Sequence, residues 1–274
     1  MNWGAIWAIV SKDMMVVRRS KAVMLPIILV PLMLLVIAPV AVIFAAQNET
    51  AAQDTLQEMS RFIEQMPAGM SEAVDARETD AEKMIILTII YMMAPLYLVI
   101  PLLVATVMAA DSFAGEKERK TIEALLYAPM TDRELLIAKV LSSWIPAVGV
   151  GLIGFIAYGV VVNVAGWPVM GEIYFPTAMW ILLALWVTPA IAATAQGVMV
   201  LVSSRVNTFQ EAYQLGGLIV LPVVVLVVGQ AAGVIYFSLW LVVLLGAVIW
   251  LINAVLFTLA ADRFRRERLL LAGV

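Results

Sequence analysis

The stretch that decides the fold is Asp111–Lys139, DSFAGEKERKTIEALLYAPMTDRELLIAK. It is a dense group of charged residues between two long apolar segments. A Lys, Arg or Asp at the centre of a membrane helix costs about 2.5–3.5 kcal/mol on insertion scales. A charged stretch between two membrane helices must therefore lie in water, where a soluble partner could bind it.

The composition indicates a membrane protein. The chain has 274 residues, of which 64% are hydrophobic and 14% charged, and its mean hydropathy is +1.00. Soluble domains carry about 25% charged residues. The absence of Cys and His excludes disulfides, thiol chemistry, His metal sites and Ser-His triads, so we expect no metal and no catalytic site. The formal net charge of −3 argues against nucleic acid as a partner.

The apolar segments predict an all-α integral membrane fold. A membrane-spanning helix needs about 20 apolar residues, and six such segments have no charge in their middle. They are near 22–46, 84–110, 135–165, 177–203, 215–234 and 238–261. The first of them is longer than the core of about 7–15 residues in a signal peptide. We predict one transmembrane domain over 22–274, preceded by a separate helix over 1–21.

Lys and Arg predict the orientation, because loops on the cytoplasmic side are enriched in them. Three of the 17 cations fall on one side of the predicted spans: Arg61, Arg77 and Lys83. The other 14 fall in the N-terminal segment, the second-to-third connection, the fourth-to-fifth connection and the C-terminal tail. We therefore expect a multi-pass protein of the cell membrane (plasma or inner) with both termini and the charged stretch in the cytoplasm.

The N-terminal segment predicts an amphipathic helix. Its apolar residues recur at spacings of 3, 4, 4 and 3, which is one helical face: Trp3, Ile6, Val10, Met14 and Val17. Lys12, Asp13, Arg18 and Arg19 lie off that stripe. A basic amphipathic helix before a span is typical of a helix on the inner leaflet, in contact with membrane lipid. The alternative is an ordinary helical start to the first span.

Residues 47–83 form one sizeable external loop with nine acidic and three basic residues. Helical spacing from Leu56 to Met66, followed by Pro67 and Gly69, predicts a short amphipathic helix, a turn and a second polar helix that enters the next span. The acidic charge could attract cations or basic ligands, but a solvated face is the preferred explanation, because a charge run alone seldom identifies a ligand.

The charged stretch itself predicts a short helix followed by a new one. Glu116 with Lys120, and Arg119 with Glu123, are spaced i,i+4 as in helix-stabilising ion pairs. Pro129 ends this helix, and Thr131 with Glu134 forms a capping-box pattern at the start of the next. The alternative to a docking helix is a solvated connector.

Phe113–Pro129, FAGEKERKTIEALLYAP, closely resembles the signature of the type-2 ABC transporter permease family. Asp132–Lys139 completes the signature, with Ala138 where Gly is usual. Lys12-Asp13 followed by Arg18-Arg19-Ser20-Lys21 is similar to the family's N-terminal segment, and 203–212 to its second cytoplasmic loop. The resemblance covers nearly the whole chain and is weakest in the external loop.

The resemblance implies six spans in each permease, two permeases (a second copy or a paralogue) and two docked P-loop ATPase subunits. It implies that the short helix near 113–128 is the coupling helix. The residues that it assigns to ATPase coupling are Phe113, Gly115, Glu116, Lys117, Glu118, Arg119, Thr121, Glu123, Leu125, Leu126 and Pro129. In the second cytoplasmic loop they are Arg205, Gln210 and Glu211. Reversing the charges of Glu116 and Arg119 is then expected to uncouple the ATPase and leave the membrane fold intact.

The chain carries no nucleotide-binding motif of its own. A P-loop needs G-x-x-x-x-G-K-[ST], and Gly115-Glu116-Lys117 lacks that spacing. We therefore expect no enzymatic activity and no cofactor in this chain, with ATP and Mg²⁺ on the partner ATPase.

Gln196 and Asn253 are polar residues well inside predicted spans. They could line a substrate path or form hydrogen bonds between helices. The resemblance favours export, and the apolar spans favour a lipophilic drug, lipid or peptide as cargo. Sodium efflux within the family has less support, because no carboxylate lies inside a span. The alternative is an ATP-independent, ion-coupled transporter or channel, although such carriers usually have ionisable residues inside the membrane and none is visible in these spans. A membrane-embedded enzyme would need a cluster of catalytic side chains at membrane depth, and the charges here all lie in loops.

Overall fold

The computed structural model describes residues 1–121 and 130–263, and all regular secondary structure in them is helical. Six helical runs in these residues are long and apolar enough to cross a membrane, which confirms the predicted fold class. They are Lys21–Ala46, Asp80–Glu118, Asp132–Met170, Ala178–Ser203, Phe209–Ala231 and Leu239–Leu259.

Most spans are composed of several helical pieces. The first consists of α2 (Lys21–Leu32), the π-helical turn η1 (Met33–Ile37) and α3 (Ala38–Ala46). The second consists of α7 (Asp80–Ile85), η2 (Ile86–Met92), α8 (Met93–Tyr97), α9 (Val99–Ala110), η3 (Asp111–Gly115) and α10 (Glu116–Glu118). The others are α12 (Asp132–Met170); α13 (Ala178–Leu182), η4 (Leu183–Val187) and α14 (Thr188–Ser203); α15 (Phe209–Gly216), η5 (Gly217–Val220) and α16 (Leu221–Ala231); and α17 (Leu239–Arg263).

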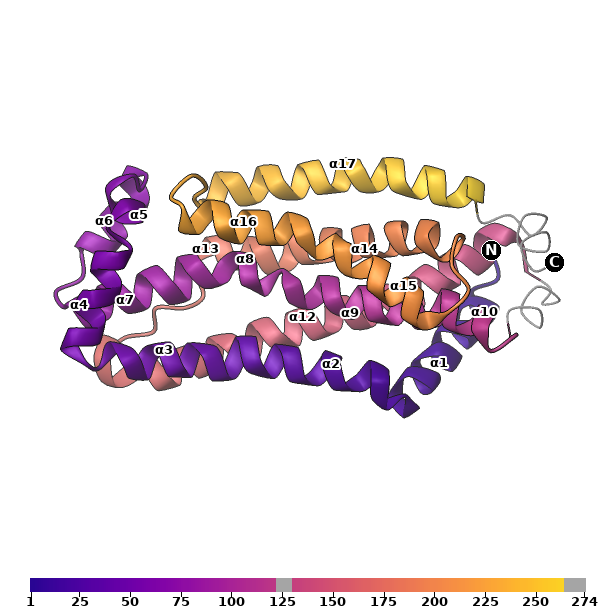
Figure 1. Ribbon diagram of the computed structural model, residues 1–274, viewed down its shortest axis with the longest axis horizontal. Helices are drawn as coiled ribbons and strands as arrows, with labels where there is room; N and C mark the ends of the chain where they lie inside the picture. Colours follow the sequence, from indigo (N-terminus) through magenta and orange to yellow (C-terminus); the bar gives the residue numbers. More distant parts are fainter. Residues whose placement is uncertain (122–129, 264–274) are drawn as a thin grey trace.

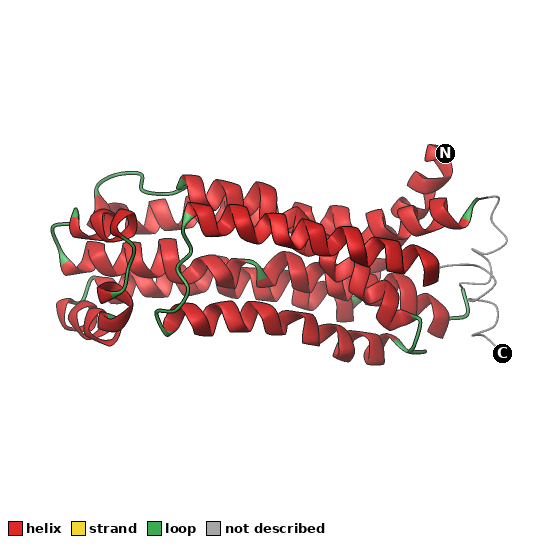
Figure 2. Ribbon diagram, turned by 90° about the horizontal axis from the view of Figure 1, so that it is seen from above, coloured by secondary structure: helices red, strands yellow, loops and turns green. Residues whose placement is uncertain are grey.

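The spans run along one axis of an elongated bundle (Figures 1 and 2). The second and fourth spans form its centre: 72% and 61% of their most apolar windows are buried, against 17–28% in the other four. α9 packs against both α14 and α12, and α14 also packs against α17. The second span is thus enclosed by the rest of the chain.

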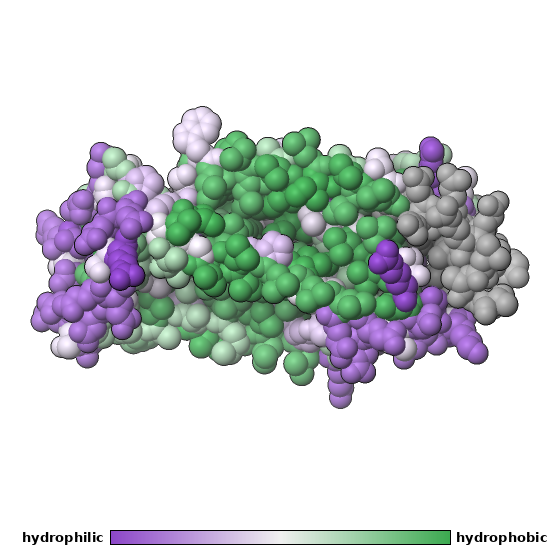
Figure 3. All heavy atoms as spheres, turned by 45° about the horizontal axis from the view of Figure 1, so that its top comes forward, coloured by the Kyte–Doolittle hydropathy of each residue, from purple (hydrophilic) through white to green (hydrophobic). Residues whose placement is uncertain are grey.

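The outer surface is apolar where a bilayer would surround it. Side chains such as Ile153, Val225 and Leu251 are 69%, 64% and 70% exposed. Figure 3 shows a broad hydrophobic band between two hydrophilic ends. In water such a surface would be unstable, whereas lipid covers it at no cost. α1 (Trp3–Arg19), α10 and the end of α17 lie at one end of the bundle (Figure 1), which is called the charged end below.

The segment between the first two spans forms more helices than expected: α4 (Glu49–Glu58), α5 (Ser60–Glu64) and α6 (Ala68–Asp75) precede α7. As predicted, a helix ends before Pro67: α5 ends at Glu64, and Pro67 is the N-cap of α6. Gly69, in contrast, lies inside α6. Two contacts fix this group to distant loops. The Tyr236 hydroxyl donates to the Phe62 carbonyl at 3.0 Å, and Arg77 pairs with Glu172 at 2.5 Å.

The second span is irregular where other spans hold it. Three successive backbone carbonyls, those of Ile89, Ile90 and Tyr91, accept side-chain hydrogen bonds at 2.8 Å from three different spans. The donors are the Tyr158 hydroxyl, the Trp180 indole and the Gln230 amide. Pro95 explains the last of these, because proline lacks the N–H that would bond the Tyr91 carbonyl in a regular helix. The Gln230 amide therefore takes the place of the backbone donor that Pro95 lacks, and the Tyr158 and Trp180 donors tie the π-helical turn to two other spans.

Gln230→Met tests this arrangement, because it keeps the side-chain length and removes the donor. We expect a loss of about 0.5–1.5 kcal/mol of unfolding free energy, the usual net value of one such bond. The measurement is the thermal unfolding midpoint in detergent micelles. Gln53→Met, on the exposed side of α4, is the matched control. An equal effect of both substitutions would mean that the Gln230 bond contributes nothing.

Candidate functional site

At the charged end, α1 buries a face that carries both apolar side chains and one charged side chain. Ile6, Val10 and Val17 are buried as predicted, and α1 packs against α12. Asp13 was predicted to lie off this face but is only 5% exposed, because it lies three residues after Val10 on the same side and has buried partners. Trp3 is 60% exposed and lies outside the buried face. The helix is therefore confirmed, and its position on the inner leaflet stays a prediction.

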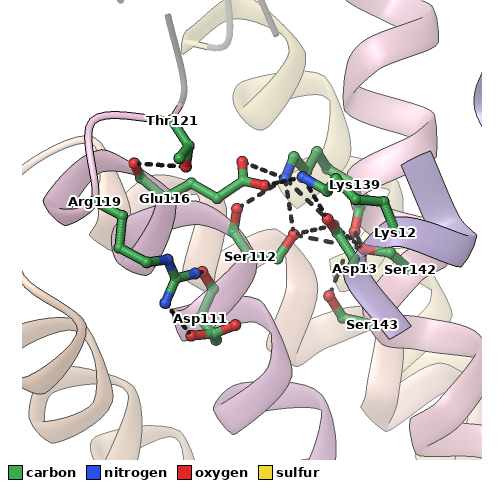
Figure 4. A network of polar contacts seen from close by, with 10 residues as sticks. All are labelled: Lys12, Asp13, Asp111, Ser112, Glu116, Arg119, Thr121, Lys139, Ser142 and Ser143. Atoms are coloured by element: carbon green, nitrogen blue, oxygen red, sulfur yellow. Dashed lines mark hydrogen bonds and ion pairs between the residues drawn. The ribbon is translucent and has the colours of Figure 1, made fainter. Parts of the chain in front are cut away.

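Four charged side chains form a closed ring at this end (Figure 4). Asp13 uses one carboxylate oxygen for Lys12, at 2.9 Å, and the other for Lys139, at 3.2 Å. Glu116 likewise uses one oxygen for Lys12 and the other for Lys139. Positive and negative groups alternate around this ring, which is called the charge ring below, and its net charge is zero.

Three of the four side chains of the charge ring are buried. The side chains of Asp13, Glu116 and Lys139 are 6%, 5% and 3% exposed, and that of Lys12 is 41% exposed. Burial of an unpaired charge costs several kcal/mol, so each group depends on its neighbours. The ring joins α1, the end of the second span and the first turns of α12, which are segments far apart in the sequence.

Serine hydroxyls complete the coordination of Asp13. The hydroxyls of Ser112 and Ser142 donate to its Oδ2 at 2.8 and 2.9 Å. Such hydrogen bonds stabilise the ionised form of a buried carboxylic acid. Burial by itself would raise the pKa of Asp13, but the charge of Lys139, the hydrogen bond and charge of Lys12 and the Ser112 hydroxyl together lower it below its usual value of 3.8.

Lys12 is shifted in the complementary direction. Burial opposes its charged form, but hydrogen bonds to Glu116 and Asp13 and the charges of both carboxylates raise the pKa of Lys12 above 10.5. The two shifts favour the charged forms of this pair, since Asp13 holds its charge to lower pH and Lys12 to higher pH than usual.

Arg119 forms a second ion pair beside the ring. Its guanidinium donates to Asp111 Oδ1 at 3.0 Å and lies against Gly115. A Cβ on Gly115 would lie 2.9 Å from Asp111 Oδ1 and 3.2 Å from the guanidinium, so glycine leaves the room that this pair occupies. Burial opposes the charge of Arg119, but the hydrogen bond and charge of Asp111 raise its pKa.

Lys117 and Glu118, the two residues after Glu116 in the signature, contact the loop between the fourth and fifth spans. Lys117 Nζ donates to the Val206 carbonyl at 3.1 Å, and Glu118 accepts from the backbone N–H of Phe209 at 2.8 Å. Phe209 is the first residue of α15, where unbonded N–H groups favour an acidic partner. The two loops at the charged end, which sequence analysis assigned separately to coupling, are therefore joined directly.

The start of α12 follows the prediction. The Thr131 hydroxyl accepts from the Glu134 N–H, and Glu134 Oε2 accepts from the Thr131 N–H, so the capping box is confirmed. Glu134 Oε1 also accepts from the Asn2 N–H at 2.7 Å. The N-terminus of α1 is thereby fixed to the N-terminus of α12.

The predicted i,i+4 pair between Glu116 and Lys120 is wrong. α10 ends at Glu118, and Lys120 has φ 56, a left-handed conformation outside the helix. Glu116 therefore does not pair with Lys120; it is 4% exposed and belongs to the charge ring. Reversing its charge would place a third cation between two lysines, so the fold would not stay intact.

The other coupling residues divide into two groups. Phe113 and Gly115 are buried, whereas Thr121 is exposed and its hydroxyl donates to the Glu116 carbonyl. Glu123, Leu125, Leu126 and Pro129 lie outside the described residues, so the helix predicted over 113–128 can be followed only to Thr121. Arg205, Gln210 and Glu211 are exposed in or next to the joined loop.

Gln196 and Asn253 each join two spans. Gln196 Nε2 donates to the Ala105 carbonyl at 3.3 Å. Asn253 donates to the Ala190 carbonyl at 2.8 Å and accepts from Thr194 at 2.9 Å. Both side chains are at most 2% exposed. These contacts favour hydrogen bonding between helices over a role in lining a path.

Sequence analysis missed the charge ring, although one signal was present. Ile6, Val10, Asp13 and Val17 follow spacings of 4, 3 and 4, so Asp13 occupies a core position of an amphipathic helix. A charge at such a position predicts a buried partner. Nothing in the sequence identifies that partner as Lys139, which is 126 residues away.

These features define a multi-span membrane protein whose charged loops are organised by one buried ring. A family model described as ABC-2 family transporter protein matches residues 7–244. The chain belongs to this family and is a membrane permease subunit of an ABC transporter, a class of transporter that works with an ATPase partner. No curated protein and no solved structure was found to match it.

Glu116→Gln tests the charge ring directly. It removes one negative charge and leaves two lysines facing one carboxylate. Removing one partner of a buried pair costs about 3–5 kcal/mol, so we expect a markedly lower thermal unfolding midpoint in detergent. Glu58→Gln, on an exposed position of α4, should leave the midpoint unchanged. A Glu116→Gln protein as stable as the parent would contradict the ring's structural role.

The lowered pKa of Asp13 predicts acid sensitivity. A carboxylate whose pKa is lower in the folded than in the unfolded state stabilises the fold fully when the pH is above the unfolded-state pKa of about 4. This stabilisation is lost as the pH falls through the folded-state pKa. We expect the unfolding midpoint to fall between pH 7 and pH 3, and to fall less in Asp13→Asn. The exposed Asp54→Asn should retain the full pH dependence. An Asp13→Asn protein with the same pH dependence as the parent would assign the effect to other carboxylates.

Proposed function

We propose that this chain is the membrane subunit of an ATP-driven exporter, with ATP hydrolysed by a separate P-loop ATPase subunit. The proposed docking surface is the stretch near 113–128, of whose described residues Arg119, Lys120 and Thr121 are exposed, together with the loop that precedes α15. The observation that carries this proposal is the direct joining of these two segments. Lys117 bonds the Val206 carbonyl and Glu118 bonds the Phe209 N–H, so one partner would act on both.

The groups available to such a partner lie on the outer side of the joined segments. Arg119, Lys120 and Thr121 are exposed, as are Arg205 and Gln210. The inward side is already occupied, since Glu116 belongs to the charge ring. We therefore assign ATPase contact to the exposed groups and a structural role to Glu116 and Phe113.

The central position of the second span supports a mechanical role. It is continuous in helical structure from Asp80 to Glu118 and is the most buried span. A displacement applied just after Glu118 would act directly on the helix that contacts most of the others. ATP-driven closure of the partner subunits would then shift the spans between inward and outward states.

A lipophilic drug, lipid or peptide is the proposed cargo. Gln196 and Asn253 form bonds between spans, which leaves a mainly apolar surface for a path between two permeases, either two copies or this chain and a paralogue. Sodium efflux has less support, because the described residues contain no group of acidic side chains that could hold a metal ion.

The proposed location is the cell membrane, plasma or inner, with the charged end in the cytoplasm. This orientation rests on the 14 Lys and Arg residues on one side of the spans and three on the other. Exposed Trp3 and Trp7 on α1, with Arg18 and Arg19 at its end, would suit an interface with anionic lipid. Catalysis, ATP and Mg²⁺ belong to the partner, and this chain acts as a non-enzymatic subunit without a cofactor.

Purification from the native membrane in mild detergent tests the proposal. We expect a P-loop ATPase to co-purify in stoichiometric amount. The double variant Lys120→Glu and Arg205→Glu should lose most of it, because both exposed cations lie on the proposed docking surface. Arg61→Glu on α5, at the opposite end, is the control and should retain it. Repeated purification without any ATPase would overturn the proposal.

A further inference from the structure

Lys139 occupies an oxygen cage of the kind that holds a monovalent cation. Its ammonium lies 3.2 Å from Asp13 Oδ2, 3.0 Å from the Ser112 carbonyl and 3.3 Å from the Ser112 hydroxyl, and it also bonds Glu116. All these ligands are oxygen atoms, the donors that hard cations prefer. Only 3% of the side chain is exposed, so water contributes little to this coordination.

The cage draws its oxygens from two segments, and the cation comes from a third. Asp13 belongs to α1, Ser112 and Glu116 belong to the end of the second span, and Lys139 belongs to α12. Ser142 orients Asp13 by donating to the same Oδ2. Lys12 bonds the other oxygen of each carboxylate from the exposed side of the ring. Lys139 therefore pairs with the carboxylate oxygens on the buried side of the ring.

We propose that Lys139 is a positioning residue: a covalently tethered cation that makes α1, the end of the second span and the start of α12 move as one body. Without its ammonium, two buried carboxylates would face only Lys12, and the ring would carry a net negative charge. Separating the three segments would likewise leave buried charges without their partners. The ring therefore holds the segments together more firmly than surface ion pairs would.

The position of the ring gives this role a functional consequence, which rests on the proposed function. Glu116 lies three residues before Arg119, where the proposed ATPase surface begins. A displacement of that surface would reach Glu116 first and pass through Lys139 to α12 and through Asp13 to α1. One signal would then move three membrane segments together.

Chemical rescue distinguishes a cation from a packing element. A cavity of about 310 Å³, lined in part by Lys12, Asp13, Glu116 and Ser142, lies beside the ring. A small ammonium ion could enter through it and take the place of the missing group. In Lys139→Ala, propylammonium supplies both the charge and the N–H donors. Tetramethylammonium supplies the charge alone and is the matched probe.

The first measurement uses the purified chain and does not depend on an ATPase. We expect Lys139→Ala to lower the unfolding midpoint by roughly 5 °C or more. Propylammonium chloride should recover most of this loss, and tetramethylammonium chloride at equal concentration should not. The charge-neutral pair Asp13→Asn with Lys139→Met should be more stable than Lys139→Met alone. Lys21→Ala, an exposed lysine, should respond to neither salt.

The second measurement uses the complex with the co-purified ATPase in lipid vesicles. Lys139→Ala should retain the bound ATPase, but ATP hydrolysis should no longer drive transport. Propylammonium should restore this coupling of hydrolysis to transport. If both ammonium salts restore stability equally, or if Lys139→Ala is as stable as the parent, the cage is wrong. If stability is rescued but coupling never depended on Lys139, its positioning role is wrong. Absence of any ATPase from the parent complex would overturn only the proposed function.

Discussion

Two lysines and two carboxylates that neutralise one another inside the bundle are the constraint on which the charged end depends. A buried charge without a partner costs several kcal/mol, so Asp13, Glu116 and Lys139 must meet whenever the chain is folded. This requirement fixes the crossing of α1 over α12 and the place where the second span ends. Hydrophobic contacts alone would tolerate many small shifts between these helices, whereas paired oxygens and ammonium groups do not. The ring thereby adds a definite polar geometry to an end of the molecule where Ile6, Phe113 and Leu135 already belong to one buried hydrophobic cluster.

The second span meets a related constraint in the apolar part of the bundle. Tyr158, Trp180 and Gln230 donate to three successive carbonyls of its π-helical turn, and the Gln230 amide replaces the backbone donor that Pro95 lacks. Because these donors come from three different spans, the irregular segment also holds the bundle together. Polar bonds at both ends of the same helix thus tie it to the rest of the chain. In a protein whose outer surface lies against lipid, such bonds specify helix positions that apolar packing would leave loosely defined.

The family membership and the ring together give the signature stretch two distinct roles. Phe113, Gly115 and Glu116 face inward and build the structure, while Lys117 and Glu118 join the neighbouring loop. Glu118, Arg119, Lys120 and Thr121 are exposed, and of these Glu118 is the one that bonds the neighbouring loop. A signature that reads as one continuous recognition motif is therefore divided by the fold into a supporting part and an accessible part.

The sequence by itself determined the six spans, the helix before them and the capping box at Thr131, because hydropathy, helical period and local capping depend on neighbours along the chain. It also determined the family, through the run from Phe113 to Pro129. It did not determine that Glu116 is buried, or that Lys139 pairs with Asp13 across 126 residues. A charge run is normally solvated, and only the approach of α1 and α12 brings compensating charges to it. The same holds for Gln230 and the Tyr91 carbonyl, since a freed backbone group can be read from Pro95 but its distant donor cannot. Local patterns thus settled which segments exist, and the tertiary structure decided which polar groups meet, because burial and pairing are properties of several segments at once.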